Sequence, residues 1–181
     1  IVVLTPDREI ASVVEKLGHE KVLVVPSDPS HPNGTARIAE FAKGYEDKTI
    51  FVNLQGDEPE LPGCHIDRLV EILKRRTDVR SVVTMATPIA ADEAMNHNVV
   101  KVVTDHYSNA LWFSRLPIPM GGPYLRHVGI YVYRGAFLKA HRWPPLYQGE
   151  GLEQLQWLEN MTPIKVYKAT VASVGVDTQA D

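Results

Sequence analysis

The sequence is poor in the features that mark several common classes of protein. It has a single cysteine, Cys64, so an internal disulfide is excluded and a reducing compartment is favoured. No Cys/His spacing of a metal site surrounds this cysteine. No apolar run approaches the ~18 residues needed to cross a bilayer. The 22 acidic and 19 basic residues give a net charge of −3, which argues against a broad surface for nucleic acid or anionic membranes.

What is present is the composition of an ordinary globular domain. The chain has 181 residues, of which 44% are hydrophobic and 23% charged, enough to bury one sizeable core. Its first residues, "IVVL" (1–4), are already an apolar, strand-like segment, with no methionine and no signal-peptide pattern. We therefore expect residues 1–181 to form one domain whose N-terminal strand is missing upstream.

Apolar segments alternate with amphipathic ones along the chain. Strands are expected at 1–4, 21–25, 49–54, 79–89, 99–105, 110–115, 126–134 and 164–170, and helices at 7–18, 35–45, 64–76, 135–142 and 149–160. The early alternation predicts a three-layer α/β sandwich with a mostly parallel, Rossmann-like sheet. The later strands read as more antiparallel, and indicate an excursion that returns to the sheet.

An acidic turn follows one of the buried strands. In "VNLQGDEPELP" (52–62) the apolar run stops at a Gln-Gly turn that is followed by Asp57 and Glu58. Asp177, in "GVDT" (175–178), follows the last strand in a similar way. Ligands of open parallel sheets bind beyond the carboxyl ends of the strands, and Mg²⁺ takes one or two carboxylates together with phosphate oxygens. The two aspartates could meet around one Mg²⁺ or simply cap turns, and the residues alone leave both interpretations open.

The segment "NGTAR" (33–37) joins a loop to the start of a predicted helix. Backbone N–H groups at such a start can meet an anion or the polar edge of a base, and Arg37 adds a cation. A plain helix start capped by Thr35 is the simpler interpretation.

The strand "RHVGIYVYR" (126–134) has two different faces. Its alternation puts His127, Gly129, Tyr131 and Tyr133 on one side and mainly aliphatic residues on the other. A ligand could lie against the strand at the glycine. A core histidine bonded to a neighbour is the alternative.

The predicted helix "EGLEQLQWLEN" (150–160) carries a polar stripe. Helical spacing aligns Glu150, Glu153 and Gln154. Two acids and an amide can accept hydrogen bonds from a polyhydroxylated ligand. The same pattern is typical of a helix face in contact with water.

Seven segments of the chain form a characteristic series: "HPNGTARIAE", "VNLQGDEP", "NHNVVKVV", "FSRLPIP", "LRHVGIYVYR", "LEQLQWLEN" and "GVDT". In this order they resemble the 3-deoxy-D-manno-octulosonate (Kdo) cytidylyltransferases, or CMP-Kdo synthetases. "LQGDEP" is shared with other sugar nucleotidyltransferases, whereas "RHVGIYVYR" followed by "LEQL" separates the Kdo enzymes from acylneuraminate cytidylyltransferases. The resemblance covers essentially the whole chain. It implies a fold of the nucleotide-diphospho-sugar transferase type with an antiparallel dimerisation excursion.

The resemblance also implies a reaction and the residues that perform it. CMP passes from CTP to Kdo, giving CMP-Kdo and pyrophosphate for lipopolysaccharide biosynthesis, with Mg²⁺ as cofactor. The implied catalytic and metal-binding residues are Asp57 and Asp177. The implied nucleotide-binding residues are Gly34, Thr35, Arg37 and Gln55. The implied residues for the sugar acid are Arg115, His127, Tyr131, Glu150, Glu153 and Gln154.

By the same resemblance we expect a homodimer in the bacterial cytoplasm, with CTP and Kdo as substrates and no nucleic-acid or membrane partner. The dimer contact and sugar-binding subregion are expected at about 124–160. The family opens with a strand and a phosphate-binding loop, "R-x-x-S-x-R-x-P-x-K", that has no match here. Two alternatives are a cytidylyltransferase for another 2-keto sugar acid, such as an acylneuraminate, and a catalytically inactive nucleotide-binding homologue.

Overall fold

The computed structural model describes residues 1–140, 150–170 and 176. Its strands are β1 (Val2–Thr5), β2 (Leu23–Pro26), β3 (Ile50–Leu54), β4 (Val82–Ile89), β5 (Lys101–Thr104), β6 (Ala110–Ser114), β7 (Tyr124–Arg134) and β8 (Ile164–Lys168). Its helices are α1 (Arg8–Lys16), α2 (Gly34–Ala42), α3 (Gly63–Lys74), α4 (Ala91–Ala94), α5 (Gly135–Ala140) and α6 (Glu153–Glu159). Every predicted element is present with its ends moved by a few residues, and α4 is additional. No helix among the described residues is long and apolar enough for a membrane span.

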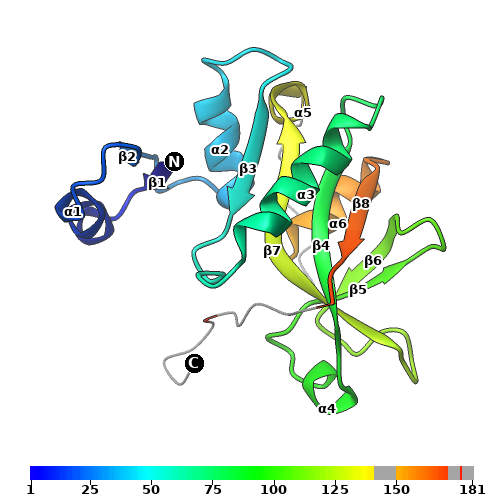
Figure 1. Cartoon of the computed structure of the whole chain (residues 1–181). Coiled ribbons are helices and arrows are strands. Elements are labelled where there is room, and N and C mark those ends of the chain that lie inside the picture. Colours follow the sequence, from blue (N-terminus) through cyan, green and yellow to red (C-terminus); the bar gives the residue numbers. More distant parts are fainter. Residues whose placement is uncertain (141–149, 171–175, 177–181) are drawn as a thin grey trace.

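A six-stranded sheet forms the centre of the molecule, as Figure 1 shows. Its order is β6-β5-β7-β4-β8, with β3 on β7. β3 and β4 each pair antiparallel with β7, and β8 is parallel to β4, so β3, β4 and β8 share one direction. The predicted β5–β6 hairpin is confirmed.

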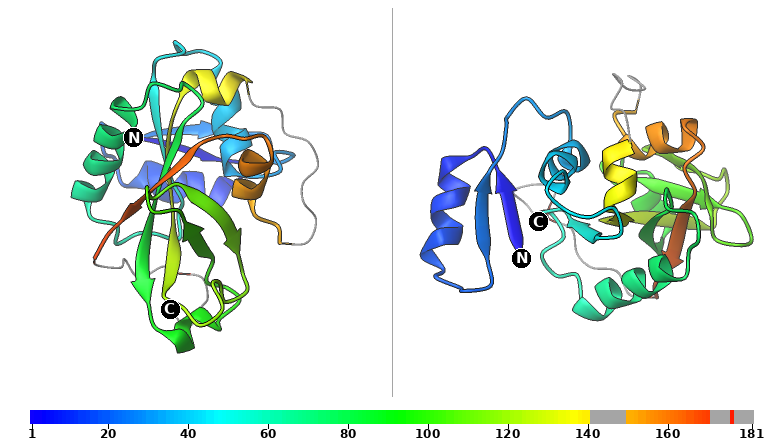
Figure 2. Two further views of the ribbon diagram at one scale, coloured as in Figure 1. Left: turned by 90° about the vertical axis from the view of Figure 1, so that its right-hand side faces the viewer. Right: turned by 90° about the horizontal axis from the view of Figure 1, so that it is seen from above.

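The sheet has a core on each face, which confirms the three-layer α/β sandwich. On one face α3 packs its buried Leu69 and Leu73 against Val128, Ile130 and Val132 of β7. On the other face α2, α5 and α6 cover a second core (Figure 2). That second core contains Ala39, Ala42, Tyr131, Tyr133, Phe137, Leu138, Leu155 and Trp157. The predicted two faces of β7 are therefore confirmed.

The first two strands do not continue the central sheet. β1 and β2 form a parallel pair of their own. Helix α1 joins them, is capped by Asp7 and has no buried residue. The expectation that all the early strands lie in one sheet is therefore wrong. Apolar strand patterns do not show which strands pair with each other. In Figure 1 this unit lies to one side of the larger sheet.

Two predicted details of the helices are wrong. Asn33, not Thr35, caps α2: the Asn33 side chain accepts a hydrogen bond from the Ala36 N–H at 2.8 Å. Helix α6 begins at Glu153, so Glu150 precedes the helix and does not share its polar face.

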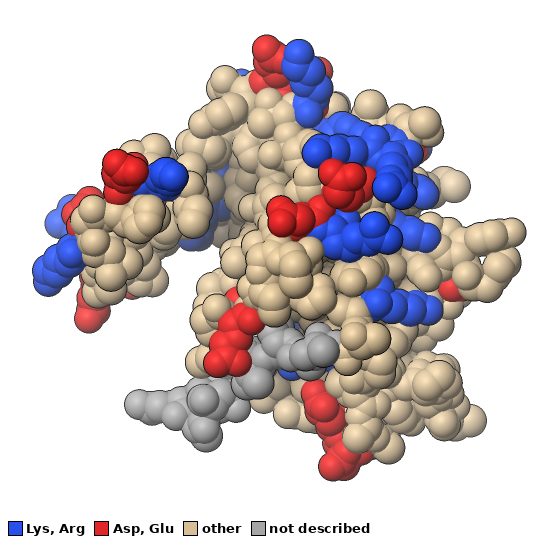
Figure 3. All heavy atoms as spheres, viewed as in Figure 1, with Lys and Arg blue, Asp and Glu red and all other residues tan. Residues whose placement is uncertain are grey.

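Basic side chains gather near the end of α3 on the face shown in Figure 3. In the loop after α3, Arg80 pairs with Asp78 at 3.1 Å.

Candidate active site

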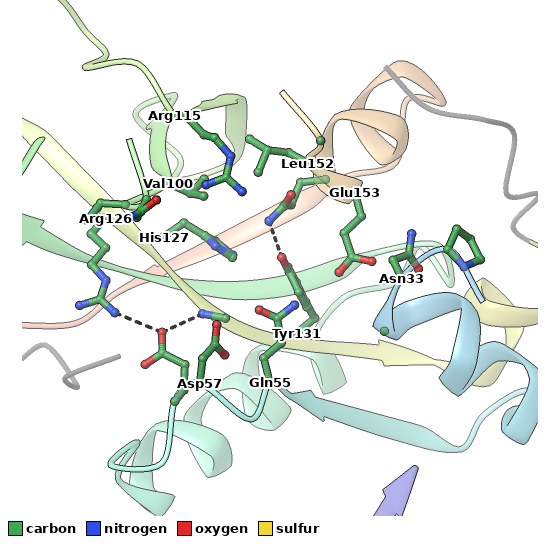
Figure 4. A pocket seen from close by; sticks show the side chains of 18 residues that line it. Asn33, Gln55, Asp57, Val100, Arg115, Arg126, His127, Tyr131, Leu152 and Glu153 are labelled. Carbon is green, nitrogen blue, oxygen red and sulfur yellow. Dashed lines mark hydrogen bonds and ion pairs between the residues drawn. The ribbon is translucent and has the colours of Figure 1, made fainter. Parts of the chain in front are cut away.

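A mostly polar cavity of about 640 Å³ opens beside β7. Its walls come from the loop before α2, the turn after β3, the segment before β5, the end of β6, and the start of α6 (Figure 4). The lining residues are Pro32, Asn33, Gly34, Gln55, Asp57, Glu58, Asn98, Val99, Val100, Arg115, Arg126, His127, Gly129, Tyr131, Gly151, Leu152, Glu153 and Gln154. Eight of the predicted site residues line this one cavity although they are far apart in sequence.

The acidic turn after β3 lies against β7. The Gln55 N–H donates to the Gly129 carbonyl at 3.0 Å. A Cβ at position 129 would lie 2.5 Å from Gln55 Oε1 and 3.3 Å from Gln55 Cβ. Glycine at this position therefore lets the Gln55 side chain lie close to the strand. The space that the sequence offered to a ligand at Gly129 is taken by Gln55.

Glu58 fixes this turn. Its Oε1 accepts hydrogen bonds from the Gly129 N–H at 3.2 Å and from the Arg126 guanidinium at 3.4 Å. The side chain is buried, so the carboxylate depends on these partners for the hydration that it has lost. These contacts hold the turn in place, so that Asp57, the residue before Glu58, lies in the cavity wall.

Asp57 is the candidate metal ligand that the structure describes. Its backbone carbonyl accepts a hydrogen bond from the Val176 N–H at 2.8 Å. Asp177, the second predicted ligand, lies outside the described residues. The described part of the chain contains no group of three His, Cys, Asp or Glu side chains suited to a metal ion. One carboxylate oxygen set beside a polar cavity still fits Mg²⁺, because this ion takes much of its coordination from substrate phosphates and water.

His127 is buried and neutral. Burial, assisted by the charge of Arg126, lowers the pKa of His127 to about 3. Its Nε2 lies 2.8 Å from Thr84 Oγ1, and that hydroxyl donates to the Ile130 carbonyl at 2.7 Å. Because the hydroxyl proton is used there, Nε2–H must be the donor to Thr84, which leaves Nδ1 as an acceptor. His127 therefore suits the recognition of a hydroxyl and not the transfer of a proton near neutral pH.

Tyr131 stands beside His127 and keeps its proton. Burial, together with the nearby Glu153 charge, raises the pKa of Tyr131 well above its ordinary value. Its hydroxyl oxygen accepts a hydrogen bond from Gln154 Nε2. The Tyr131 O–H remains a donor that a ligand can use, and the ring is held edge-on against Trp157 with centroids 5.0 Å apart.

Two acceptors at the start of α6 have no partner of normal geometry among the described residues. They are the carboxylate of Glu153 and the amide oxygen of Gln154. Burial raises the pKa of Glu153 to about 7, and the nearby Thr35 hydroxyl and N–H oppose that rise. Both side chains are buried, contrary to the expectation of a helix face in contact with water. Unsatisfied buried acceptors in a cavity wall indicate a site for a ligand that donates hydrogen bonds.

The start of α2 contributes less than predicted. Asn33 and Gly34 line the cavity. Thr35 is buried behind them, where its Oγ1 accepts a 3.4 Å hydrogen bond from Asn53. Arg37 is not among the lining residues. The predicted nucleotide roles of Thr35 and Arg37 stay predictions.

Arg115 lines the cavity, but Glu150 does not. The Glu150 carboxylate accepts hydrogen bonds from Ser114 Oγ at 2.5 Å and from the Arg115 N–H at 2.7 Å. Glu150 therefore contacts a predicted ligand-binding residue, whereas its own predicted contact with the sugar acid stays a prediction.

Comparison with known proteins agrees with this arrangement. The Cytidylyltransferase family model matches residues 1–168. The chain is 41% identical over 189 residues to the 3-deoxy-manno-octulosonate cytidylyltransferase of Leptospira biflexa, a match that covers the whole chain and 75% of that protein. It is 40% identical over 207 residues to the enzyme of that name from Halorhodospira halophila, with coverage of 100% and 77%. This chain belongs to the 3-deoxy-manno-octulosonate cytidylyltransferase family.

Solved structures support the family assignment. A structure of CMP:2-keto-3-deoxy-manno-octonic acid synthetase complexed with CTP has a TM-score of 0.86 and 33% identity, and the match covers 99% of this chain and 76% of that chain. HddC from Yersinia pseudotuberculosis, complexed with GMP-PN, has a TM-score of 0.68 at 13% identity, which shows the fold alone. The predicted fold type and the predicted membership of this cytidylyltransferase family are both confirmed.

Sequence reasoning did not assign a role to four polar residues that line the cavity of this cytidylyltransferase. They are Asn33, Glu58, Asn98 and Arg126. Glu58 and Arg126 lie 68 residues apart, so no local pattern joins them. Arg126 and His127 both line the cavity, although strand alternation puts neighbouring residues on opposite faces. A register shift on β4 at Thr84/Met85 marks an irregularity in the β4–β7 pairing that no alternation pattern predicts.

Proposed function

We propose that this chain transfers CMP from CTP to Kdo and releases pyrophosphate. The observation that carries the proposal is the cavity itself. An acidic turn that suits a metal–phosphate group lies at one end, and buried, unpartnered acceptors lie at the other. A nucleoside triphosphate and a polyhydroxylated acid are the two kinds of ligand that these ends suit. The CTP complex of the related synthetase structure supports the first of them.

In this proposal the anomeric hydroxyl of Kdo attacks the α-phosphorus of CTP. The new O–P bond forms as the bond to the pyrophosphate oxygen breaks, and the hydroxyl proton passes to water or to the released pyrophosphate. Bound Mg²⁺ would neutralise charge on the phosphate oxygens. Asp57, with Asp177 as the predicted second ligand, would hold it. Gln55 and the N-terminal turn at Gly34 would contact the nucleotide.

The remaining wall would hold the sugar acid. Arg115 would pair with its carboxylate, because a guanidinium matches a carboxylate in a two-point contact. The Tyr131 hydroxyl would donate to the sugar. The acceptors His127 Nδ1, Glu153 and Gln154 would accept hydrogen bonds from its hydroxyl groups. Their role is to bind and orient, so that the attacking oxygen lies in line with the leaving group.

The metal role of Asp57 has a direct test. Asp57→Asn should lower Mg²⁺-dependent pyrophosphate release from CTP and Kdo by at least about 10²-fold, because it removes an anionic ligand from a site of developing phosphate charge. The melting temperature should stay close to that of the wild-type protein. Asp67→Asn, an exposed change on α3, is the matched control. Unchanged turnover would contradict the metal role, and a large loss of folding would favour a turn-capping role.

A second candidate is the same transfer to another 2-keto sugar acid. The acidic turn would serve any sugar acid that accepts CMP, so the choice between these acids depends on the end of the cavity near Glu153. Pyrophosphate release should be measured on the full-length protein with Kdo, an acylneuraminate and other keto sugar acids. A preference of about tenfold or more for one acid assigns the substrate. No turnover with any acid would favour the inactive nucleotide-binding homologue.

The context of the reaction is part of the same proposal. The product would feed lipopolysaccharide assembly in the bacterial cytoplasm, and the protein would be a homodimer through the region of about 124–160. Several exposed apolar side chains near this region support a contact, among them Leu116, Met120 and Met161. Sedimentation velocity on the full-length protein would show whether it is a dimer.

A further inference from the structure

Lys101 is a buried cation that lies behind the cavity wall. It has no exposed surface. Its Nζ donates to the carbonyl oxygens of Asn96 at 3.0 Å, Val99 at 2.6 Å and Arg115 at 2.6 Å. An ammonium group has three N–H bonds, so these contacts use all of them. Lys101 therefore has no donor left for a ligand, and its role must be exerted through its neighbours.

Those neighbours belong to two segments that form one side of the cavity. The segment before β5 supplies Asn98, Val99 and Val100 to the wall, and Arg115 follows directly after β6. The three carbonyls that Lys101 holds come from these same two segments. The ammonium thus fixes the distance between them at the point where they meet the cavity.

Arg115 is held on its other side by Glu150. The Glu150 carboxylate accepts from the Arg115 N–H and from Ser114 Oγ, and the Glu150 carbonyl accepts from Arg115 Nε at 3.3 Å. Arg115 Nη1 donates to the His97 carbonyl at 3.1 Å. Figure 4 shows the Arg115 guanidinium at the cavity, above His127. Two cations and one carboxylate meet in this cluster, so it presents a net positive charge to an anionic ligand.

The charges of the cluster also explain how a lysine is tolerated there. Burial, above all, lowers the pKa of Lys101, while the Glu150 carboxylate acts in the opposite direction and Arg115 adds to the lowering. A buried ammonium is costly unless its hydrogen bonds are complete. Here all three hydrogen bonds of the ammonium are made, and their acceptors are backbone carbonyls of the two segments that form the cavity wall.

We propose that Lys101 is a positioning residue that fixes the Arg115 guanidinium in the geometry that receives the carboxylate of the sugar acid. This inference rests on the proposed function, because it needs an anionic second substrate. If the lysine had a purely structural role, its replacement would lower the stability of the folded protein. The variant would still bind each of the two substrates as well as the wild-type protein does. A positioning role has a selective signature, since in the proposed function Arg115 contacts the sugar acid and not CTP.

The test compares Lys101→Met with wild-type full-length protein. Methionine has a similar length but no donors. KM for Kdo should rise about tenfold, while kcat and KM for CTP stay within about twofold. Lys165→Met is the matched control, because the Lys165 ammonium on β8 also donates to a backbone carbonyl, that of Tyr107, but neither of these two residues lines the cavity. It should leave both KM values unchanged.

A double variant separates positioning from general damage. If Lys101 acts through Arg115, the KM for Kdo of Lys101→Met with Arg115→Gln should equal that of Arg115→Gln alone. Additive losses, or a lower melting temperature with both KM values unchanged, would overturn the proposal.

Should Lys101→Met fail to fold, Ser114→Ala decides. It removes one hydrogen bond from the Glu150 carboxylate that holds Arg115. It should raise KM for Kdo about threefold and leave KM for CTP unchanged. A KM for Kdo equal to that of the wild-type protein would overturn the proposal. Wild-type protein that turns over no Kdo would instead refute the proposed substrate, and the same comparison would then use whichever keto sugar acid is turned over.

Discussion

Two buried glutamates line the same cavity, and their surroundings differ. Glu58 and Glu153 are 4% and 8% exposed. Glu58, at the Arg126 side, accepts hydrogen bonds from the Gly129 N–H and the Arg126 guanidinium. Neither oxygen of Glu153, at the Asn33 side, has a hydrogen bond of normal geometry to the described residues. Burial is alike in the two cases, so the difference lies in the partners.

The difference indicates which buried carboxylate stabilises the fold and which one is available to bind a ligand. A partnered carboxylate recovers the hydration that it lost on burial, and its removal leaves its partners unsatisfied. An unpartnered carboxylate destabilises the folded state until something donates to it. We therefore expect opposite signs for the two residues: Glu58 stabilises the folded protein, and Glu153 destabilises it in favour of binding.

The largest effect on stability is expected at Glu58. Glu58→Ala should lower the free energy of unfolding by roughly 3 to 4 kcal/mol, because it leaves the Gly129 N–H and the mostly buried Arg126 guanidinium without this acceptor. Urea denaturation at pH 7.5 measures it. Glu60→Ala, an exposed acid in the same turn, is the control and should change stability by less than about 0.5 kcal/mol. Equal effects of the two variants would contradict the structural role of Glu58.

The next effect is of opposite sign and depends on pH. In the unfolded chain the Glu153 carboxyl has its ordinary pKa of 4.5, and in the folded protein burial raises it to about 7. The folded protein therefore holds an extra proton between these values, and its stability falls as pH rises from 4.5 to 7. Glu153→Gln removes this titration. Relative to wild type, the variant should be unchanged below pH 4.5 and more stable by up to about 3 kcal/mol above pH 7.

Urea denaturation of both proteins from pH 4 to pH 8 measures the Glu153 effect. Glu159→Gln, an exposed change at the end of the same helix, should show no pH-dependent difference from wild type. The stabilised Glu153→Gln variant should nevertheless bind the sugar acid more weakly, because an acceptor has become partly a donor. A variant whose stability difference does not change with pH would show that Glu153 is already ionised in the folded protein.

The sequence was sufficient for this site where the pattern is local. Alternation along β7 places His127 and Tyr131 on one face, and the glycine turn after β3 places Asp57 at a strand end; both lie in the cavity wall. The pairing of Glu58 with Gly129, 71 residues away, is not local and was not predicted. Lys101 shows the same limit, since its three carbonyls are supplied by the folded loops and not by its neighbours on the strand.

The fold shows the same division between local and long-range information. Helix and strand periodicity located every predicted element. The separate β1–β2 sheet and the central place of β7 between β3 and β4 depend on which edges meet, and the amino-acid pattern of a strand does not encode its partner.

The smallest effect is expected at Asn33. Its one side chain combines the two roles that Glu58 and Glu153 have separately, stabilising the fold and offering a polar group to a ligand. Its Oδ1 caps α2, whereas its Nδ2 is buried without a partner among the described residues. Asn33→Ala should cost about 1 kcal/mol at every pH because the cap is lost, and Asn33→Ser should cost only a few tenths because serine caps as well. Neither substitution supplies Nδ2, so both should raise KM for the substrate that this amide contacts by the same factor of about three. Kinetics that follow stability, with serine restored to wild-type KM, would place Asn33 with Glu58 as a structural residue.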